Sequence, residues 1–217
     1  NQNAVLMGDY LYASATLLVA VELGLDIAHI LSDTFLKMTG AELRQSRLVW
    51  NPAAGYENYL NVIEGKTAAL FVSCTRGDAG FAGGPSPVVE AFTAYGRGFG
   101  LGFQIVDDVL DYSPKSASWG KEPLKDFTEG LVTLPLIYAL RDGNGTGRTC
   151  VLKHLETRGA SSCDATVIDR LFTSSGAIDS CMALAAQFID EGVAAIAGHV
   201  PTDRLAAFAR ESLARTY

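Results

Sequence analysis

Four polar side chains recur at helical spacing between residues 96 and 112, and together they could bind a divalent cation. They occupy positions i, i+3, i+4 and i+7, which one helix face would hold: Gln104, Asp107, Asp108 and Asp111. Because like charges one turn apart destabilise a helix, this stripe needs compensation from elsewhere. Carboxylate and amide oxygens suit Mg²⁺ better than zinc or copper, and Mg²⁺ commonly shares carboxylates with substrate phosphates. The stripe therefore predicts a site for a metal-bound phosphate ligand.

The alternative for this stripe is an acidic helix face exposed to water, since DDxxD is a short pattern that occurs by chance. The surrounding sequence argues against it, because no Lys or Arg lies between Arg97 and Lys115. The opposite helix face is apolar, with Phe99, Phe103, Val106 and Leu110 at i, i+4, i+7 and i+11. An ordinary exposed face would also carry lysines, so a buried functional stripe is favoured.

Basic residues in two other segments are candidates for binding the phosphate. Lys66 and Thr67 lie in an apolar helical segment, and a buried ammonium is costly unless an anion pairs with it. A lysine that extends to the surface along its methylene stem is the alternative. The loop after the acidic helix carries Lys121, Lys125 and Asp126, which could close over a metal site.

The pattern of the chain predicts helices throughout, in a single helical bundle that spans residues 1–217. We expect helices over 4–23, 25–50, 56–74, 88–112 and 133–141, followed by a helical tail in two or three pieces. Turns are expected at Asn51-Pro52 and in the Gly-rich segment 77–87, and a loop over 113–130. That loop would lie beside the acidic stripe.

Composition excludes several classes of protein. The 217 residues are 48% hydrophobic and 19% charged, which is typical of a folded domain rather than a disordered one. A net charge of −7 and the absence of a Lys/Arg cluster argue against a nucleic-acid surface. The 4 cysteines are widely spaced without a CxxC pair, so neither a disulfide framework nor a zinc site is indicated, and a reducing cytoplasm is the simplest setting.

An apolar run at residues 11–31 raises the question of a membrane span. Glu22, Asp26 and His29 interrupt the run and Gly24 should break it, so a buried core helix followed by a second helix is the favoured interpretation. No transmembrane segment and no signal peptide are expected. The chain begins within an already periodic segment, which indicates a domain that lacks its N-terminal helices.

Taken together, these segments resemble the trans-isoprenyl (polyprenyl) diphosphate synthases. GFQIVDDVLDY is similar to the second aspartate-rich motif of that family, and IEGKTAALF to its Lys-Thr helix. GKEPLKDFTEGLVTLPLIYAL is similar to the loop and helix that follow, and AVLMGDYLYASA to the segment after the first aspartate-rich motif. The resemblance covers nearly the whole chain. It implies an all-α bundle around a deep apolar cavity, usually in a homodimer.

The resemblance also implies an activity and roles for single residues. The reaction is the Mg²⁺-dependent head-to-tail condensation of isopentenyl diphosphate with an allylic prenyl diphosphate. Asp107, Asp108 and Asp111 match the metal-binding acids, and Asp126 matches an acid of the supporting loop. The residues matching those that contact the allylic diphosphate are Lys66, Thr67, Gln104 and Lys121.

Two departures from the family pattern bear on activity. The first aspartate-rich motif with its arginines, and the Gly-Lys-Arg segment that binds isopentenyl diphosphate, should precede Asn1 and are absent. These residues would supply half of the metal site, so the 217-residue chain alone is expected not to condense prenyl units. Leu131 stands where the family often has Lys. The segments resemble the bacterial polyprenyl group more than the farnesyl type, so a medium-to-long-chain product is expected.

Three other kinds of protein compete with the enzyme. A non-catalytic subunit that regulates an active synthase would explain the missing first motif, but it has no need of Lys66, Gln104 and the aspartates. A class I terpene cyclase needs a similar metal cluster but generally lacks the Lys-Thr helix. A helical bundle without a ligand leaves the acidic stripe unexplained. The sequence favours a polyprenyl diphosphate synthase.

Overall fold

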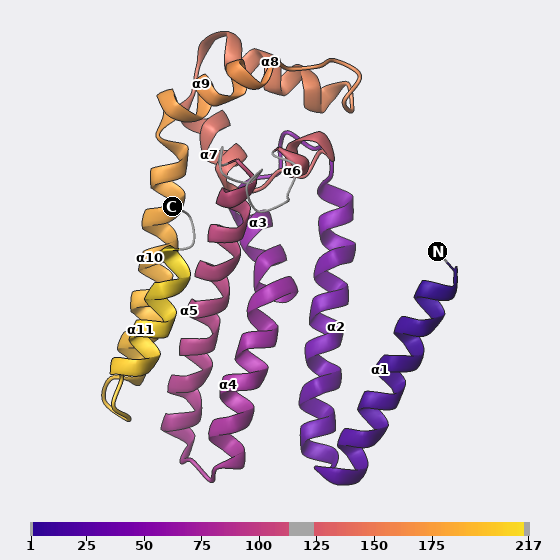
Figure 1. Ribbon diagram of the computed structural model, residues 1–217, viewed down its shortest axis with the longest axis vertical. Coiled ribbons are helices and arrows are strands. Elements are labelled where there is room, and N and C mark those ends of the chain that lie inside the picture. Colours follow the sequence, from indigo (N-terminus) through magenta and orange to yellow (C-terminus); the bar gives the residue numbers. More distant parts are fainter. Residues whose placement is uncertain (1, 113–123, 215–217) are drawn as a thin grey trace.

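A computed structural model describes residues 2–112 and 124–214, and every regular element in these ranges is helical. Figure 1 shows the arrangement. In chain order the elements are α1 (Gln2–Glu22), α2 (Leu25–Leu48), α3 (Tyr56–Ile63), the π-helical turn η1 (Glu64–Ala68), α4 (Ala69–Phe81), α5 (Ser86–Asp111), α6 (Lys125–Thr128), α7 (Leu134–Asp142), α8 (Gly145–Glu156), α9 (Ala165–Ser175), α10 (Ala177–Ile196) and α11 (Asp203–Ala214). The predicted all-α fold is confirmed.

The long helices form a row, with α5 packed between α10 and α4, α4 against α2, and α2 against α1 (Figure 1). Helix α11 packs against α10 and α5, and α8 and α9 lie across one end of the row (Figure 1). The segments near the acidic stripe, α3, α6 and α7, gather at that same end (Figure 1). The row thus brings the ends of α2, α3 and α5 together.

Helix α5 packs closely on α4 and α10 because four of its glycines face these two neighbours in alternation. A Cβ at Gly100 would lie 2.5 Å from the Ala68 Cα on the α4 side, and one at Gly102 would lie 2.7 Å from Ile189 Cγ1 on α10. Gly96 and Gly98 make similar approaches to these two sides. Side chains at these positions would push the helices apart, so the glycines fix the position of the acidic helix.

The core lies around the C-terminal half of α5, where Leu101, Ile105 and Val106 are at most 1% exposed. Leu134 and Leu136 of α7 belong to the same cluster and are fully buried. Burying each such side chain contributes about 1.5–3 kcal/mol. This core holds the helix that carries the aspartates.

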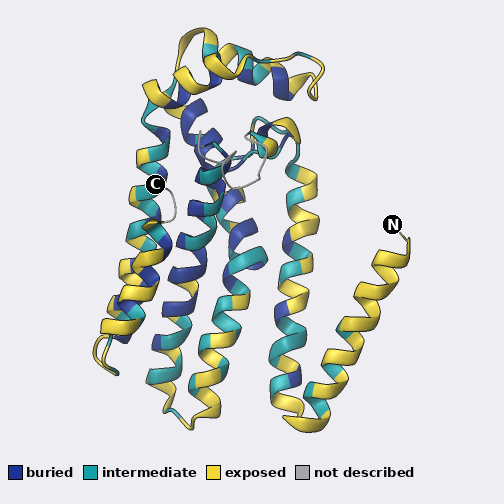
Figure 2. Cartoon of the chain, viewed as in Figure 1, coloured by how far each residue is buried: buried dark blue, intermediate teal, exposed yellow. Residues whose placement is uncertain are grey.

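Helix α1 differs from the prediction. Gly24, with φ of 90°, breaks the apolar run as expected, but no residue of α1 is buried (Figure 2). Val5, Leu6, Leu17 and Leu18 are each more than half exposed. The prediction of a buried core helix is therefore wrong for α1, since apolarity alone does not show whether a packing partner is present. By length and mean hydropathy, α1 also meets the criterion for a helix that could cross a membrane.

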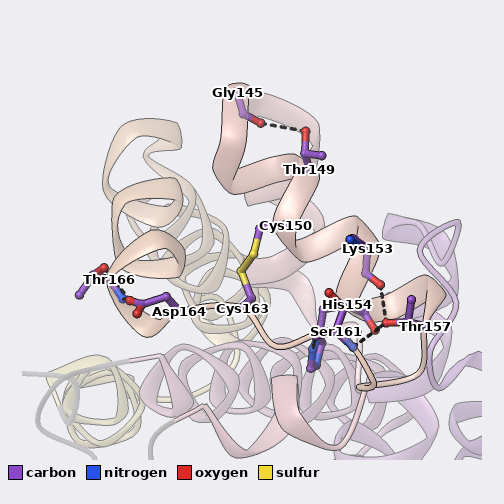
Figure 3. The surroundings of a disulfide bond; sticks show 10 residues. All are labelled: Gly145, Thr149, Cys150, Lys153, His154, Thr157, Ser161, Cys163, Asp164 and Thr166. Carbon is purple, nitrogen blue, oxygen red and sulfur yellow. Dashed lines mark hydrogen bonds between the residues drawn. A yellow bond between two sulfur atoms is a disulfide. The ribbon is translucent and has the colours of Figure 1, made fainter.

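The cysteines include one bonded pair. Cys150 on α8 and Cys163, just before α9, form a disulfide whose Cα atoms lie 5.7 Å apart (Figure 3). The sequence did not indicate this single disulfide, because the turn after α8 brings together two cysteines that no sequence pattern pairs. The cysteines therefore give no argument for a reducing compartment.

Two predicted segments differ from the structure in where their helices begin or end. The helix expected over 56–74 continues through η1 to Phe81, so Gly77 and Gly80 lie within a helix instead of a loop. The described part of the loop expected over 113–130 contains the short helix α6. The tail, expected in two or three helical pieces, contains the four helices α8 to α11, and the remaining predicted helices agree with the structure to within a few residues.

Candidate functional site: an acidic pocket beside Lys66

A cavity of about 190 Å³ lies where the ends of α2 and α5 meet α3, η1 and α6. Its polar lining is formed by Gln45, Tyr59, Lys66, Gln104, Asp107, Asp108, Asp126 and Thr133. Apolar side chains, among them Val62, Ile63, Leu131 and Val132, complete it. The structure thus brings together five of the eight site residues predicted from sequence. Thr67 joins them by a hydrogen bond to Gln104.

Asp108 is held by protein donors. The Tyr59 hydroxyl donates to its Oδ2 at 2.6 Å, and Gln104 Nε2 donates to its Oδ1 at 2.8 Å. The side chain is buried, and burial is the main cause that raises the pKa of Asp108 to about 7. The two hydrogen bonds oppose that rise, and the nearby carboxylates Asp126 and Asp107 add to it.

Gln104 links the acidic helix to the Lys-Thr segment. Thr67 Oγ1 donates to Gln104 Oε1 at 2.5 Å, while the Gln104 amide nitrogen donates to Asp108. One amide therefore has its orientation fixed from both ends. Gln104 projects into the pocket from a fixed position.

Lys66 lies in the π-helical turn, and π-turns inside helices often mark functional positions. Its Nζ donates to Gln45 Oε1 at 2.9 Å and lies 3.1 Å from Glu42 Oε1. The lysine side chain is 33% exposed, so the ammonium is neither buried without a partner nor fully solvated. The sequence pointed to an anionic ligand as its partner, and in this structure two residues of α2 take that place.

Asp111 is not among the residues that line the pocket. Its carboxylate accepts hydrogen bonds from the backbone N–H groups of Lys125 and Asp126, at 3.2 and 3.0 Å. Its backbone carbonyl accepts another from Leu124 at 2.9 Å. These bonds satisfy donors at the start of α6, as a helix cap does. Asp111 therefore ties α6 to the acidic helix.

That attachment places Asp126 in the pocket. Burial raises the pKa of Asp126 to about 6, and the neighbouring Asp111 and Asp107 raise it further, while Lys66 lowers it. Burial is the largest of these causes and the two neighbouring carboxylates come next, so Asp126 lies in a water-poor region beside other negative charges. Such a region attracts a cation.

The donor set fits part of a Mg²⁺ site. Within residues 2–112 and 124–214, no group of three or more His, Cys, Asp or Glu side chains is arranged to hold a metal ion. Mg²⁺ usually takes only one or two protein carboxylates and completes its shell with water and phosphate oxygens. Asp107 and Asp126 line the pocket and could provide that pair. Both oxygens of Asp108 already accept hydrogen bonds.

Other predicted residues lie elsewhere. Lys121 lies outside the described residues, so its predicted contact with a diphosphate stays a prediction. Lys125 is exposed and lies 3.8 Å from Glu129. Leu131, which stands where the resemblance leads one to expect Lys, lines the pocket and adds no charge to it.

Sequence reasoning missed three residues of the site. Tyr59 lies in an apolar helix and has the appearance of a core residue. Glu42 and Gln45 are i, i+3 neighbours near the end of α2, and a polar pair at a helix end normally faces water. Only the packing of α2 against η1 shows that they contact Lys66.

Comparison with known proteins gives consistent matches. Residues 1–171 match the family model described as polyprenyl synthetase. The chain is 35% identical to the octaprenyl diphosphate synthase of Haemophilus influenzae over 90% of its own length and 59% of that protein. It is 36% identical to the nonaprenyl diphosphate synthase of Mycobacterium tuberculosis, over 79% of this chain and 50% of that protein. The chain thus spans between half and three fifths of these relatives.

Solved structures of other proteins have the same fold as this chain. A decaprenyl diphosphate synthase from Rhodobacter capsulatus superposes with a TM-score of 0.88 at 31% identity, over 100% of this chain and 68% of that one. A polyprenyl synthase from Caulobacter crescentus, complexed with calcium and isoprenyl diphosphate, gives 0.85 at 31% identity, over 99% of this chain and 65% of that one.

Proposed function

The chain belongs to the polyprenyl synthetase family, and on that premise we propose that the protein is a polyprenyl diphosphate synthase. It would join isopentenyl diphosphate to an allylic prenyl diphosphate, head to tail, in a Mg²⁺-dependent reaction. The observation that carries this proposal is the pocket that Asp107 and Asp126 line together with Lys66 and Gln104. Charges of both signs around a small cavity suit a metal-bridged diphosphate.

The chemistry requires neutralisation of a leaving group. Diphosphate leaves an allylic carbon only when its negative charge is stabilised as the carbon–oxygen bond breaks. Asp107 and Asp126 would hold Mg²⁺, which when bound supplies positive charge to the phosphate oxygens. Lys66 would move its ammonium from Glu42 and Gln45 to the diphosphate, a short displacement for a side chain with four rotatable methylenes.

The other pocket residues orient and shield the reacting group. Gln104, fixed by Thr67 and Asp108, has an amide hydrogen left to donate to a phosphate oxygen. Leu131 and Val132 add apolar surface to the pocket, which would limit access of water to an allylic cation.

These residues form one acidic wall of such a site. Ionisation of an allylic diphosphate needs a cluster of metal ions, and holding such a cluster takes more carboxylates than Asp107 and Asp126. We therefore propose that the 217-residue chain does not condense prenyl units by itself. Purified chain that forms product from the two diphosphates would refute this part.

A homodimer is the proposed assembly. Support comes from α1 and α2, where large apolar side chains are exposed along the edge of the row, among them Leu6, Leu17, Leu36 and Leu43. Size-exclusion chromatography with light scattering would test it.

A regulatory subunit without catalytic activity is the second candidate, and the two relatives named above count against it because both are synthases. The deciding experiment expresses the complete coding region and measures incorporation of radiolabelled isopentenyl diphosphate on an allylic primer. Asp107→Asn should lower incorporation by orders of magnitude. The matched control is Asp190→Asn, an exposed aspartate that pairs with Arg210 at 3.1 Å and should leave the rate unchanged. No incorporation by the complete protein would favour the regulatory subunit.

A further inference from the structure

Tyr59 is a buried residue of the pocket for which the proposed chemistry has no use. It lies on α3, is 6% exposed, and its hydroxyl donates to Asp108 Oδ2 at 2.6 Å. The two residues are 49 positions apart in sequence. A phenol that donates to a buried carboxylate makes a charge-assisted hydrogen bond, about twice as strong as a neutral one.

The Tyr59 bond is one end of a chain of three hydrogen bonds. Asp108 also accepts from Gln104, and Gln104 accepts from Thr67. The chain joins α3, α5 and η1 through side chains that are buried or half-buried. Since both oxygens of Asp108 accept from protein donors, neither points toward a ligand without competition.

The neighbouring aspartate has a different role. Successive residues on a helix point about 100° apart, so Asp107 and Asp108 cannot both face α3. Asp108 faces Tyr59 and accepts its hydrogen bond, while Asp107 points in a different direction from the same helix and lines the same pocket as Asp126. The two adjacent aspartates are thus separated by the geometry of the helix.

We propose that Tyr59 is a positioning residue that holds the Asp108 carboxylate, and through it Gln104, so that Asp107 and Asp126 bind the metal and Asp108 does not. The inference rests on the proposed function, because it assigns roles within the same Mg²⁺-diphosphate site. Loss of the Tyr59 hydroxyl would leave a buried carboxylate oxygen without its donor and release Gln104 from its fixed orientation.

The test measures binding of Mg²⁺, in the presence of inorganic pyrophosphate, to the protein from the complete coding region by titration calorimetry. Tyr59→Phe removes only the hydroxyl and should weaken Mg²⁺ binding by about tenfold, the value of one charge-assisted hydrogen bond. Tyr95→Phe is the matched control. Tyr95 is also buried, and its hydroxyl donates to the Leu205 carbonyl at 3.1 Å, which lies on another part of the fold. That variant should bind as the wild type does.

Asparagine variants then distinguish an aspartate that binds the metal directly from one that only holds neighbouring side chains in place. Asp108→Asn keeps an acceptor for Tyr59 and should weaken Mg²⁺ binding by no more than about tenfold, whereas Asp107→Asn should weaken it by at least a hundredfold. The double variant Tyr59→Phe/Asp108→Asn should bind no more weakly than the weaker single variant, because both changes break the same contact. Thermal unfolding in EDTA identifies any variant that fails to fold.

The outcomes distinguish the inference from its premise. Wild-type protein that binds no Mg²⁺-pyrophosphate refutes the proposed function, and the role of Tyr59 with it. Wild-type binding with Tyr59→Phe equal to Tyr95→Phe refutes the role of Tyr59 alone. Equal losses in Asp107→Asn and Asp108→Asn would show that Asp108 is a ligand, which also refutes it.

Discussion

The buried carboxyl of Asp108 predicts an unusual dependence of stability on pH in metal-free protein. Its pKa is raised to about 7 in the folded state, mainly by burial, from an ordinary value of 3.8. The folded state therefore holds this proton more tightly than the unfolded state. The stabilisation is fully present below about pH 4 and is lost as the pH rises toward 7, at up to about 1.4 kcal/mol per pH unit.

The size of the effect follows from the two pKa values. Between pH 5 and pH 8, linkage gives a loss of roughly 2–3 kcal/mol for Asp108 alone. Other carboxylates contribute to the total slope, so the useful quantity is the difference between wild type and Asp108→Asn. Asparagine does not titrate and still accepts the Tyr59 hydrogen bond. The variant should therefore become more stable relative to wild type by that amount as the pH rises.

The assay is urea denaturation followed by circular dichroism at several pH values in EDTA. Equal m-values for the two proteins would show that the same surface is exposed on unfolding. Asp164→Asn is the control: this exposed aspartate caps α9 through the Thr166 N–H at 2.8 Å, and its pKa is lowered by its hydrogen bonds with Thr166. Its contribution is lost only at acid pH, so that variant should follow wild type between pH 5 and 8. A constant difference for Asp108→Asn over this range, or one of opposite sign, would contradict the reasoning.

Three further substitutions test the fold around the site. Gly102→Ala should destabilise the protein by about 1–3 kcal/mol in urea denaturation, because its Cβ would lie 2.7 Å from Ile189 Cγ1; Gly8→Ala, where nothing lies within 4 Å, is the control. Asp111→Ala should increase hydrogen exchange in α6 while α10 keeps its protection, since it removes the acceptor of two α6 N–H groups; unchanged α6 exchange would contradict the capping role. Cys150→Ser should lower stability by about 3 kcal/mol, the value for a closed loop of this length, while Cys74→Ser, an exposed free thiol, should not; equal stability of the two would exclude the disulfide in solution.

The sequence predicted which segments form the site because its signals are local. Three aspartates at helical spacing and a lysine in an apolar helix need no tertiary knowledge to be noticed. The loop after the acidic helix supplied Asp126 as a candidate, and the resemblance supplied its role and the order of the motifs. The pocket that contains Lys66, Asp107 and Asp126 agrees with this expectation of proximity.

The spacing of the three aspartates could not predict which residues each of them contacts. Asp108 and Asp111 lie on the same stripe as Asp107, yet one faces Tyr59 and the other the start of α6. Which donors an aspartate meets depends on contacts between segments distant in sequence. The same reason explains why Glu42 and Gln45 were missed.

The exposure of α1 and the disulfide were not predicted, for related reasons. Hydrophobicity predicts that a helix needs a partner, but the described residues bury none of α1. Cys150 and Cys163 are 13 residues apart, and only the turn after α8 brings them together.

The most direct test of the central claim is a crystal structure of the complete protein with inorganic pyrophosphate and Mn²⁺ in place of Mg²⁺. The anomalous scattering of Mn²⁺ locates the metal ion. The account predicts Mn²⁺ bound at about 2.1 Å to an oxygen of Asp107 and an oxygen of Asp126, with Lys66 moved from Glu42 to a phosphate oxygen. Manganese on Asp108 with Tyr59 displaced, or pyrophosphate bound away from Lys66, would contradict it.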